Sequence, residues 1–274
     1  MLYEYEINGV IFYLYNKILQ PQNVKELNVR CNELRPFIKM SGALMARWID
    51  KFLHTPTNLW YMVLDKFYTL DKYSKDVRYY IRLGQRNFDL IREKTKEKIV
   101  SAIISVDSKV NYSKKNIDKN FINSHVESLS DSYQFWLVKD KSGEIVGYVL
   151  IYVEQDQIQI RTFHLLEWAK KKGGSYFVNY KLSEIFLLNK GMKKIFYGMR
   201  NLVHQTTVQS WLEKKFFYRK QYVKMKVCLM WKARLLYYIF LPFKPLLKVL
   251  PFAKTKMLFG FVEYIYLVNK DKKE

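Results

Sequence analysis

The sequence predicts an α/β fold with a mixed, mostly antiparallel sheet, a central parallel pair of strands and flanking helices. Two observations predict it. Three short alternating segments with tight turns between them occupy residues 133–166, a pattern typical of an antiparallel meander. A helix and a further strand follow the last segment, and a strand-helix-strand order requires a parallel pair with a right-handed crossover.

The composition predicts a folded chain with an anionic partner. Of 274 residues, 49% are hydrophobic and 17% aromatic, which supplies a substantial core and excludes a disordered chain. Lys and Arg outnumber Asp and Glu by 47 to 25, a net charge of +22. This surplus indicates a phosphorylated metabolite, nucleic acid or an anionic membrane face as partner, although a general lysine bias that serves solubility also produces it.

Residues 1–75 are expected to form an N-terminal hairpin and a helical extension. Leu2 to Tyr15 alternates around Asn8-Gly9, the dipeptide that favours a type I′ turn between two strands. From about residue 23 to 68 the pattern predicts helical pieces, broken at prolines and at Ser41-Gly42.

Residues 76–230 carry the sheet, and their elements can be read in chain order from hydrophobic period and turn residues. We expect a strand at 76–83, a helix at 87–104, a polar loop or short helix at 107–123, strands at 133–139, 145–153 and 157–166, a helix at 176–189, a strand at 194–199, a helix at 206–215 and a last strand at 218–230.

The pattern of residues 231–274 predicts a basic, apolar C-terminal tail. Lysines and arginines alternate with aromatic and aliphatic residues, three prolines interrupt the segment, and no acidic residue precedes Glu263. Prolines and lysines exclude a helix that spans a membrane, while the mixture suits an interfacial segment on an anionic membrane. A helix pair that packs on the domain or on a second subunit fits the pattern equally.

The turn Ala169–Ser175 reads Ala-Lys-Lys-Lys-Gly-Gly-Ser and joins the third meander strand to a helix. The first amides of a helix are unpaired and its dipole is positive there, so anions bind at such a position. Gly173 and Gly174 let the backbone approach an anion closely, and three lysines add charge. The turn therefore predicts a phosphate site, with a solvated lysine turn as the alternative.

Around this turn, residues 76–230 resemble the GNAT acyltransferases, the GCN5-related N-acetyltransferase family. Lys139–Tyr148 resembles the hairpin between the family's second and third strands, which reads Gly-x-Ile-Val-Gly; here Gly143-Glu144-Ile145-Val146-Gly147 stands there. Lys170–Ser175 occupies the pyrophosphate loop, with Lys170 in place of Arg or Gln. Gln205–Phe217 resembles the closing helix, with Leu212 in place of the usual Tyr and Phe216 in place of Gly.

The resemblance implies that acetyl-CoA or another acyl-CoA binds at this loop. Its diphosphate would lie on the backbone amides of Lys172–Ser175, and its pantetheine arm beside the strand that ends at Phe163-His164-Leu165. The implied cofactor residues are Leu165, Lys170, Lys172, Gly173, Gly174, Ser175 and Gln205.

Acyl transfer to an amine needs a group that removes a proton from the acceptor, and imidazole is the natural side chain for this at neutral pH. His164 lies on the strand that enters the loop, Glu167 at the end of that strand, and His204 just past the next strand. These three residues are the catalytic candidates, and each has a structural role as its alternative. No residue is assigned to a metal.

Three functions follow. The first is an acyl-CoA-dependent N-acyltransferase that acts on a small amine, such as an amino sugar of surface polysaccharide biosynthesis. The second is an aminoacyl-tRNA-dependent transferase of the peptidoglycan cross-bridge type, which the charge of +22 favours. The third is a non-catalytic module that binds a nucleotide or a membrane.

The expected location is cytoplasmic, with peripheral binding to the inner face of the membrane. The N-terminus has no signal-peptide pattern, and no apolar run is long enough to span a bilayer. Cys31 and Cys228 lack metal-ligand spacing and are expected to be unpaired thiols in a reducing compartment.

Overall fold

The computed structural model describes residues 4–110, 118–202, 207–250 and 252–271, and the chain forms two compact units. Unit 1 comprises Val63–Gly198 and Ser210–Arg219; unit 2 comprises Leu2–Met62, Met199–Gln209 and Lys220–Glu274. Each unit therefore draws on separate stretches of the chain. The boundaries expected at residues 75 and 230 stay a prediction.

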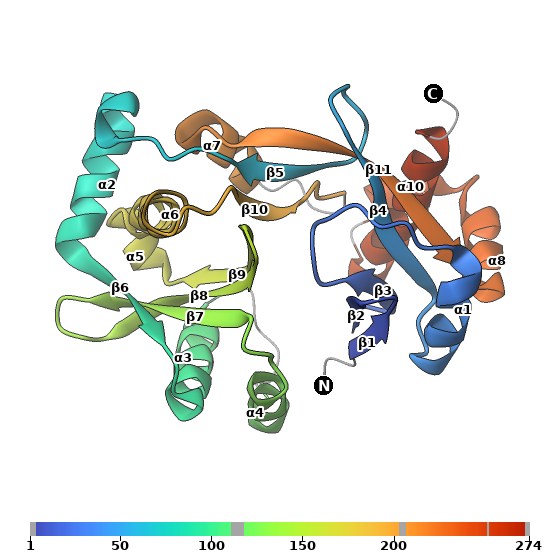
Figure 1. Ribbon diagram of the computed structural model, residues 1–274, viewed down its shortest axis with the longest axis horizontal. Coiled ribbons are helices and arrows are strands. Elements are labelled where there is room, and N and C mark those ends of the chain that lie inside the picture. Colours follow the sequence, from blue (N-terminus) through green and yellow to red (C-terminus); the bar gives the residue numbers. More distant parts are fainter. Residues whose placement is uncertain (1–3, 111–117, 203–206, 251, 272–274) are drawn as a thin grey trace. The chain divides into compact units, whose positions relative to one another are not determined.

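Unit 1 is built on five strands in the spatial order β10-β9-β8-β7-β6 (Figure 1). Neighbours from β6 to β9 pair antiparallel, and β9 pairs parallel with β10. This arrangement confirms the predicted fold class, including the meander and the central parallel pair. The strands are β6 (Phe88–Glu93), β7 (Tyr133–Asp140), β8 (Ile145–Glu154), β9 (Gln157–Leu165) and β10 (Lys194–Met199).

Helices cover both faces of this sheet (Figure 1). On one face, α3 packs against β8 and β9, and α4 packs against α3. On the other, α6 packs against β6, α5 and α2. The bounds are α2 (Lys75–Asn87), α3 (Lys96–Lys109), α4 (Lys119–Glu127), α5 (Glu167–Lys171), α6 (Gly174–Ser183, continued by a π-helical turn Glu184–Asn189) and α7 (Thr207–Phe216).

The predicted strand at 76–83 is wrong, because these residues belong to helix α2. Val77, Ile81 and Gly84 are its buried residues, at the i, i+4, i+7 spacing of one helix face. Val77 and Ile81 are also an even number of residues apart, so the same residues satisfied a strand period. The helix expected from residue 87 divides into β6 and α3.

Unit 2 contains the strand order β1-β2-β3-β4-β11. Asn8 and Gly9 both have positive φ, 53° and 72°, and join β1 to β2, which confirms the predicted hairpin. The helical pieces expected as far as residue 68 are largely wrong, because only α1 lies there beside strands β4 and β5. The bounds are β1 (Glu4–Ile7), β2 (Val10–Tyr15), β3 (Ile18–Pro21), α1 (Cys31–Met40), β4 (Met45–Leu53), β5 (Trp60–Leu64, which runs from unit 2 into unit 1) and β11 (Arg219–Leu229).

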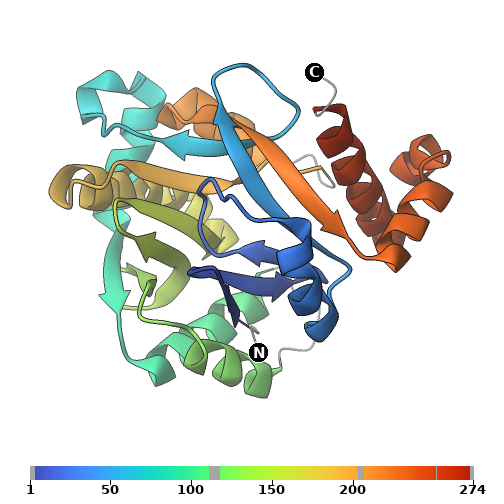
Figure 2. The same ribbon diagram turned by 45° about the vertical axis from the view of Figure 1, so that its right-hand side comes forward.

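The C-terminal residues of unit 2 are helical. They form α8 (Trp231–Phe240), α9 (Lys244–Val249) and α10 (Ala253–Lys270), and α10 packs against α8 and α9 (orange to red in Figure 2). Among the described residues, no helix combines the length and the apolar character that a membrane crossing requires.

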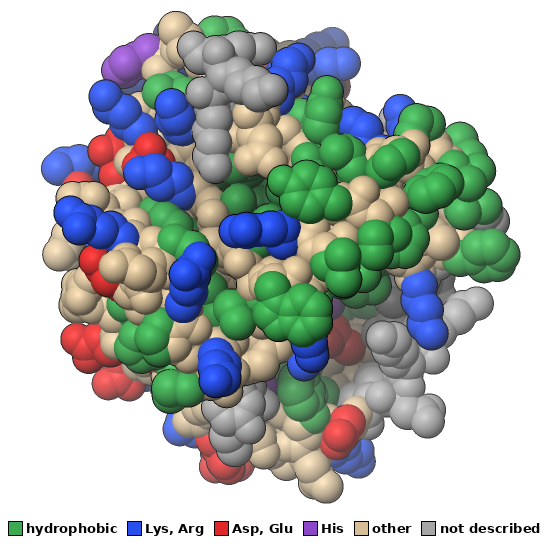
Figure 3. Space-filling view, turned by 90° about the vertical axis from the view of Figure 1, so that its right-hand side faces the viewer, with side chains coloured by type: hydrophobic (Ala, Val, Ile, Leu, Met, Phe, Trp, Pro, Cys, Tyr) green, Lys and Arg blue, Asp and Glu red, His purple; other side chains and the backbone are tan. Residues whose placement is uncertain are grey.

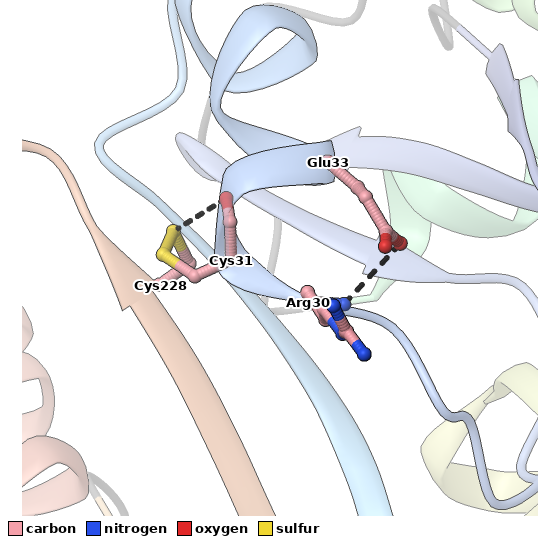
Figure 4. Close-up of a disulfide and its surroundings, with 4 residues drawn as sticks. All are labelled: Arg30, Cys31, Glu33 and Cys228. Atoms are coloured by element: carbon pink, nitrogen blue, oxygen red, sulfur yellow. Dashed lines mark hydrogen bonds between the residues drawn. A yellow bond between two sulfur atoms is a disulfide. The ribbon is translucent and has the colours of Figure 1, made fainter.

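Cys31 and Cys228 form a disulfide, which corrects the expectation of unpaired thiols (Figure 4). Cys31 opens α1 and Cys228 lies near the end of β11, with their Cα atoms 5.3 Å apart. The two residues are separated by 197 positions in the sequence. Spacing along the chain therefore gave no sign that folding brings them together.

Candidate functional site

A β-bulge in β9 decides where His164 points. β8 pairs Ile151 with Ile160 but Leu150 with Thr162, so Arg161 is an extra residue in β9. Strict alternation would put His164 on the same face as Ile158 and Ile160. The bulge moves it to the opposite face, beside its partner Tyr148 and towards α3.

On that face, His164 joins a cluster with Asp107 of α3 and Tyr148 of β8. The Nδ1 atom of His164 lies 2.6 Å from Asp107 Oδ1, and the Tyr148 hydroxyl is 3.1 Å from both Asp107 oxygens. Burial, reinforced by the Asp107 carboxylate, raises the pKa of Tyr148, so this hydroxyl stays protonated and donates. The side chains of His164 and Asp107 are 33% and 19% exposed, so water and small solutes reach the cluster.

This geometry gives His164 the form of a general base. An Asp carboxylate on Nδ1 accepts the Nδ1–H hydrogen bond and selects the tautomer whose Nε2 carries the lone pair. The sequence predicted His164 but missed Asp107 and Tyr148. Asp107 stood at the start of an expected polar loop, whereas the structure places it in the last turns of α3.

The parallel pair of β9 and β10 is short. Its register runs from Lys194 opposite Gln157 to Phe196 opposite Gln159, and β9 then continues to Leu165 without a further partner in β10. The two strands therefore separate towards the carboxyl end of β9. His164 lies on the part of β9 beyond this parallel pairing.

Helix α5 follows β9 and contains Lys170, and the turn at Lys172 and Gly173 joins α5 to α6. This turn is held by backbone hydrogen bonds. The amides of Lys172 and Gly173 donate to the carbonyls of Trp168 and Lys170, at 3.2 and 3.1 Å. Gly173 has φ +83° and is the residue before α6. Gly174 packs on Leu165, whose Cδ2 lies 2.8 Å from the position of a Cβ at residue 174. Leu165, Lys170, Lys172, Gly173, Gly174 and Ser175 are thus contiguous in space.

Helix α2 covers this turn. A Cβ on Gly173 would lie 2.4 Å from the carbonyl oxygen of Tyr80 and 3.0 Å from the amide nitrogen of Gly84. The rings of Tyr80 and Tyr176 stack above the first turn of α6, with centroids 4.9 Å apart. Gly173 and Gly174 are buried, and because they have no side chain they allow α2 to approach α6 closely.

The outer side of α2 is strongly basic. A groove of about 720 Å³ is lined by Lys75, Arg78, Tyr79, Arg82, Leu83 and Arg86. The acidic residue of this helix, Asp76, is paired with Lys215 of α7 at 2.5 Å, so it does not offset the four cations. Spacing of three and four residues puts these cations on one face of the helix.

The remaining predicted site residues are placed as follows. Glu167 is exposed at the start of α5 and forms an ion pair with Lys170 at 2.6 Å, and the ammonium group of Lys172 lies 5.3 Å from the ring centroid of Trp168. His204 and Gln205 lie outside the described residues. The catalytic and cofactor assignments stay predictions.

Comparison with known proteins gives structural neighbours alone, since no family model and no curated protein matches the sequence. The solved structure of FemX has a TM-score of 0.55 and 9% identity, covering 84% of this chain and 85% of that one. L-PGS from Bacillus licheniformis has a TM-score of 0.54 and 13% identity, covering 86% of both chains.

The C-terminal domain (DUF2156) of a putative lysylphosphatidylglycerol synthetase from Agrobacterium fabrum is similar to a comparable extent. Its TM-score is 0.52 with 12% identity, and the match covers 85% of both chains. At such identities the likeness shows a shared fold. With the strand order of unit 1, its parallel pair and its crossover helix, the chain has a divergent GNAT-like fold.

Proposed function

We propose that this chain transfers an aminoacyl group from charged tRNA to an amine acceptor, with unit 1 holding the donor. One observation carries the proposal: α2 packs onto Gly173 with its backbone and presents four cations on its outer side. Backbone atoms of α2 this close to Gly173 leave no room for a diphosphate on that side of the turn. A row of cations suits the repeated phosphates of an RNA strand.

The structural neighbours support a group-transfer enzyme of this kind. One of them is named for the synthesis of lysylphosphatidylglycerol, a compound that joins an amino acid to a phospholipid. Transfer of an aminoacyl group to a membrane-bound acceptor is consistent with the charge of +22. The fold alone is compatible with several donors, so the argument for tRNA rests on α2.

The cluster at His164 supports the chemistry. An ammonium group must lose a proton before its nitrogen can attack the ester carbon of the donor, and Nε2 of His164 accepts that proton while Asp107 holds the ring. The new amide C–N bond then forms, the ester C–O bond breaks, and the tRNA ribose oxygen leaves with a proton. The pairing of β9 with β10 ends at Gln159 and Phe196, and we place the aminoacyl end beyond that point, on the part of β9 that carries His164.

An acyl-CoA-dependent N-acyltransferase acting on a small amine, such as an amino sugar, is the second candidate. The exposed Lys171 and Lys172 beside the end of β9 favour it, because they would attract the phosphates of coenzyme A. In both candidates we propose that the acceptor is held at an anionic membrane surface.

The test compares the two donors on the full chain. We expect tRNA to bind with a steep dependence on salt, and acetyl-CoA to leave the melting temperature unchanged. An acetyl-CoA site would instead give about 2.7 kcal/mol of stabilisation at ~100 times its Kd. Stabilisation by acetyl-CoA without tRNA binding would select the second candidate, and the absence of both effects would reject both.

Two double variants test whether tRNA binds at α2. Arg78→Gln with Arg82→Gln should reduce the slope of log K against log salt by roughly 1.4 to 1.8, since each phosphate contact contributes about 0.7 to 0.9. Lys94→Gln with Lys98→Gln removes the same charge from exposed positions, one just before α3 and one in its first turn, and serves as the control. Equal effects of the two pairs would show that binding depends on net charge alone.

A further inference from the structure

An exposed apolar face lies on the C-terminal helices of unit 2. From Trp231 to Met257, large apolar side chains are exposed to an extent that runs from 48% for Ile239 to 73% for Val249. Others in this group are Leu235, Tyr238 and Leu246. Figure 3, which views the side on which α8 lies in Figure 1, shows hydrophobic side chains gathered with basic ones between them. A face of this extent marks an interaction site.

These side chains are not needed for the core of unit 2. The helices are already anchored by other residues: Ala233 and Tyr237 bury the inner side of α8, Leu247 that of α9, and Val262 and Ile265 that of α10. The helices therefore carry apolar residues on both sides, one side packed and the other exposed.

The charges on this face select its partner. Lys232, Lys248 and Lys254 are exposed and form no ion pair with any residue described in the structure. The acidic residue of α10, Glu263, is already paired with Lys244 at 3.0 Å. Contact with a second copy would bring these cations together and cost free energy. An anionic bilayer satisfies both the apolar side chains and the cations.

A pocket of about 470 Å³ is continuous with this face. It lies between α1, the end of β11 and the start of α8, and its lining includes Arg35, Leu229, Trp231, Arg234, Leu235 and Tyr238. Most of the lining is apolar or aromatic, with two guanidinium groups that come from different helices. A guanidinium group pairs with phosphate oxygens through two parallel hydrogen bonds. Apolar walls with paired arginines suit the phosphodiester and upper acyl chain of a phospholipid.

We infer that α8, α9 and the start of α10 dock on an anionic phospholipid bilayer, and that the pocket at Arg35 and Arg234 takes the phosphodiester of one lipid. This inference rests on the proposed function in one respect, the acceptor held at an anionic membrane surface, and it does not depend on which donor the chain uses. It describes how the chain reaches an acceptor held in a membrane.

The experiment is co-sedimentation of the full chain with vesicles of phosphatidylcholine, alone or with added phosphatidylglycerol. We expect binding to the mixed vesicles. Leu235→Gln with Leu246→Gln should weaken it at least tenfold with an unchanged melting temperature, because both side chains are exposed. Met40→Gln, at an even more exposed apolar residue that lies on α1, is the control and should bind as the parent chain does.

Charge variants distinguish the contribution of the exposed lysines to vesicle binding from the contribution of the pocket. Lys248→Gln with Lys254→Gln should weaken binding by about fivefold for each lysine, and only on vesicles that contain phosphatidylglycerol. Arg35→Gln with Arg234→Gln should weaken binding more than this lysine pair does. Inorganic phosphate at matched ionic strength should not release the chain, because the pocket takes a lipid; release by phosphate would overturn that assignment.

Three results would overturn the docking inference. They are the absence of binding to mixed vesicles, equal binding by the Leu235/Leu246 variant, and a dimer in sedimentation velocity that the same variant dissociates. Quenching of tryptophan fluorescence by brominated lipid tests the parent chain without a substitution, and Trp231→Phe should remove the quenched component. Vesicle binding and tRNA binding are separate readouts, so failure of one leaves the other interpretable.

Discussion

The backbone of Gly173 lies against the backbone of Tyr80, so closely that a Cβ at residue 173 would stand 2.4 Å from the Tyr80 carbonyl oxygen. Gly173 also has φ +83°, a conformation that L-residues adopt at a cost. This contact holds helix α2 against the turn that precedes α6. The close approach and the positive φ together explain why residue 173 is a glycine, and no bound ligand is needed for the explanation.

Gly173→Ala should therefore destabilise the chain by roughly 3–4 kcal/mol, the sum of the φ cost and the displacement of α2. Urea denaturation measures the loss. Gly191→Ala is the matched control, because Gly191 has φ +63° but no atom within 4 Å of its would-be Cβ. The control should lose only about 1–2 kcal/mol. Equal losses at both positions would mean that α2 does not press on the turn.

Asp107→Asn should lower kcat by roughly 10²- to 10⁴-fold, the usual contribution of a positioned proton acceptor. The amide cannot select the His164 tautomer as the carboxylate does, while the fold and KM should change little. Tyr148→Phe removes a hydroxyl that contacts Asp107 and His164 but leaves both of those groups in place, so it should cost less. Asp89→Asn, an exposed carboxylate paired with Lys141, is the control. A kcat that falls equally in the Asp89 variant would remove the cluster from the mechanism.

The meander could be predicted from the sequence because its signals are local. Alternation within each strand and turn residues such as Ser142-Gly143 set β7, β8 and β9 without reference to the rest of the chain. The same reasoning failed at β4, whose burial does not alternate because residues such as Met45 and Ala46 are buried in succession. Buried strands of this kind lack the period-2 signal.

The site could be predicted only in part. His164 was identified from its position before the turn, but the residues that contact its ring are not close to it in sequence. Asp107 is brought to it by α3, and one extra residue at Arg161 turns His164 to that side. A bulge has no reliable local signature, so the sequence did not reveal which face of the sheet carries the cluster.

The ion pair between Asp76 and Lys215 gives stability a dependence on acid pH. Hydrogen bonds from Lys215 and Ser74 lower the pKa of Asp76 to about 2, from 3.8. Because the folded value is the lower one, this contribution is present above pH 3.8 and is lost as the pH falls towards 2. The melting temperature of Asp76→Asn should therefore lie below that of the parent chain at pH 7, and the gap should narrow on acidification.

The Asp76–Lys215 ion pair is exposed. We therefore expect a small difference in melting temperature between Asp76→Asn and the parent chain at neutral pH, and a smaller difference in high salt. Asp140→Asn tests specificity, because the Asp140 carboxylate accepts its hydrogen bonds inside a turn rather than from a second helix. A gap for Asp76→Asn that stays constant between pH 7 and acid would contradict the assignment.

The disulfide between Cys31 and Cys228 should contribute about 2–4 kcal/mol to the free energy of unfolding, because it closes a long loop of the unfolded chain. A reductant, or the double substitution of both residues to alanine, should lower the melting temperature by roughly 5–10 °C. The reductant should then have no effect on the double variant. Alkylation of the denatured chain without reductant, followed by mass measurement, counts the thiols directly. We expect neither cysteine to be modified, and labelling of both would show that the two residues remain reduced.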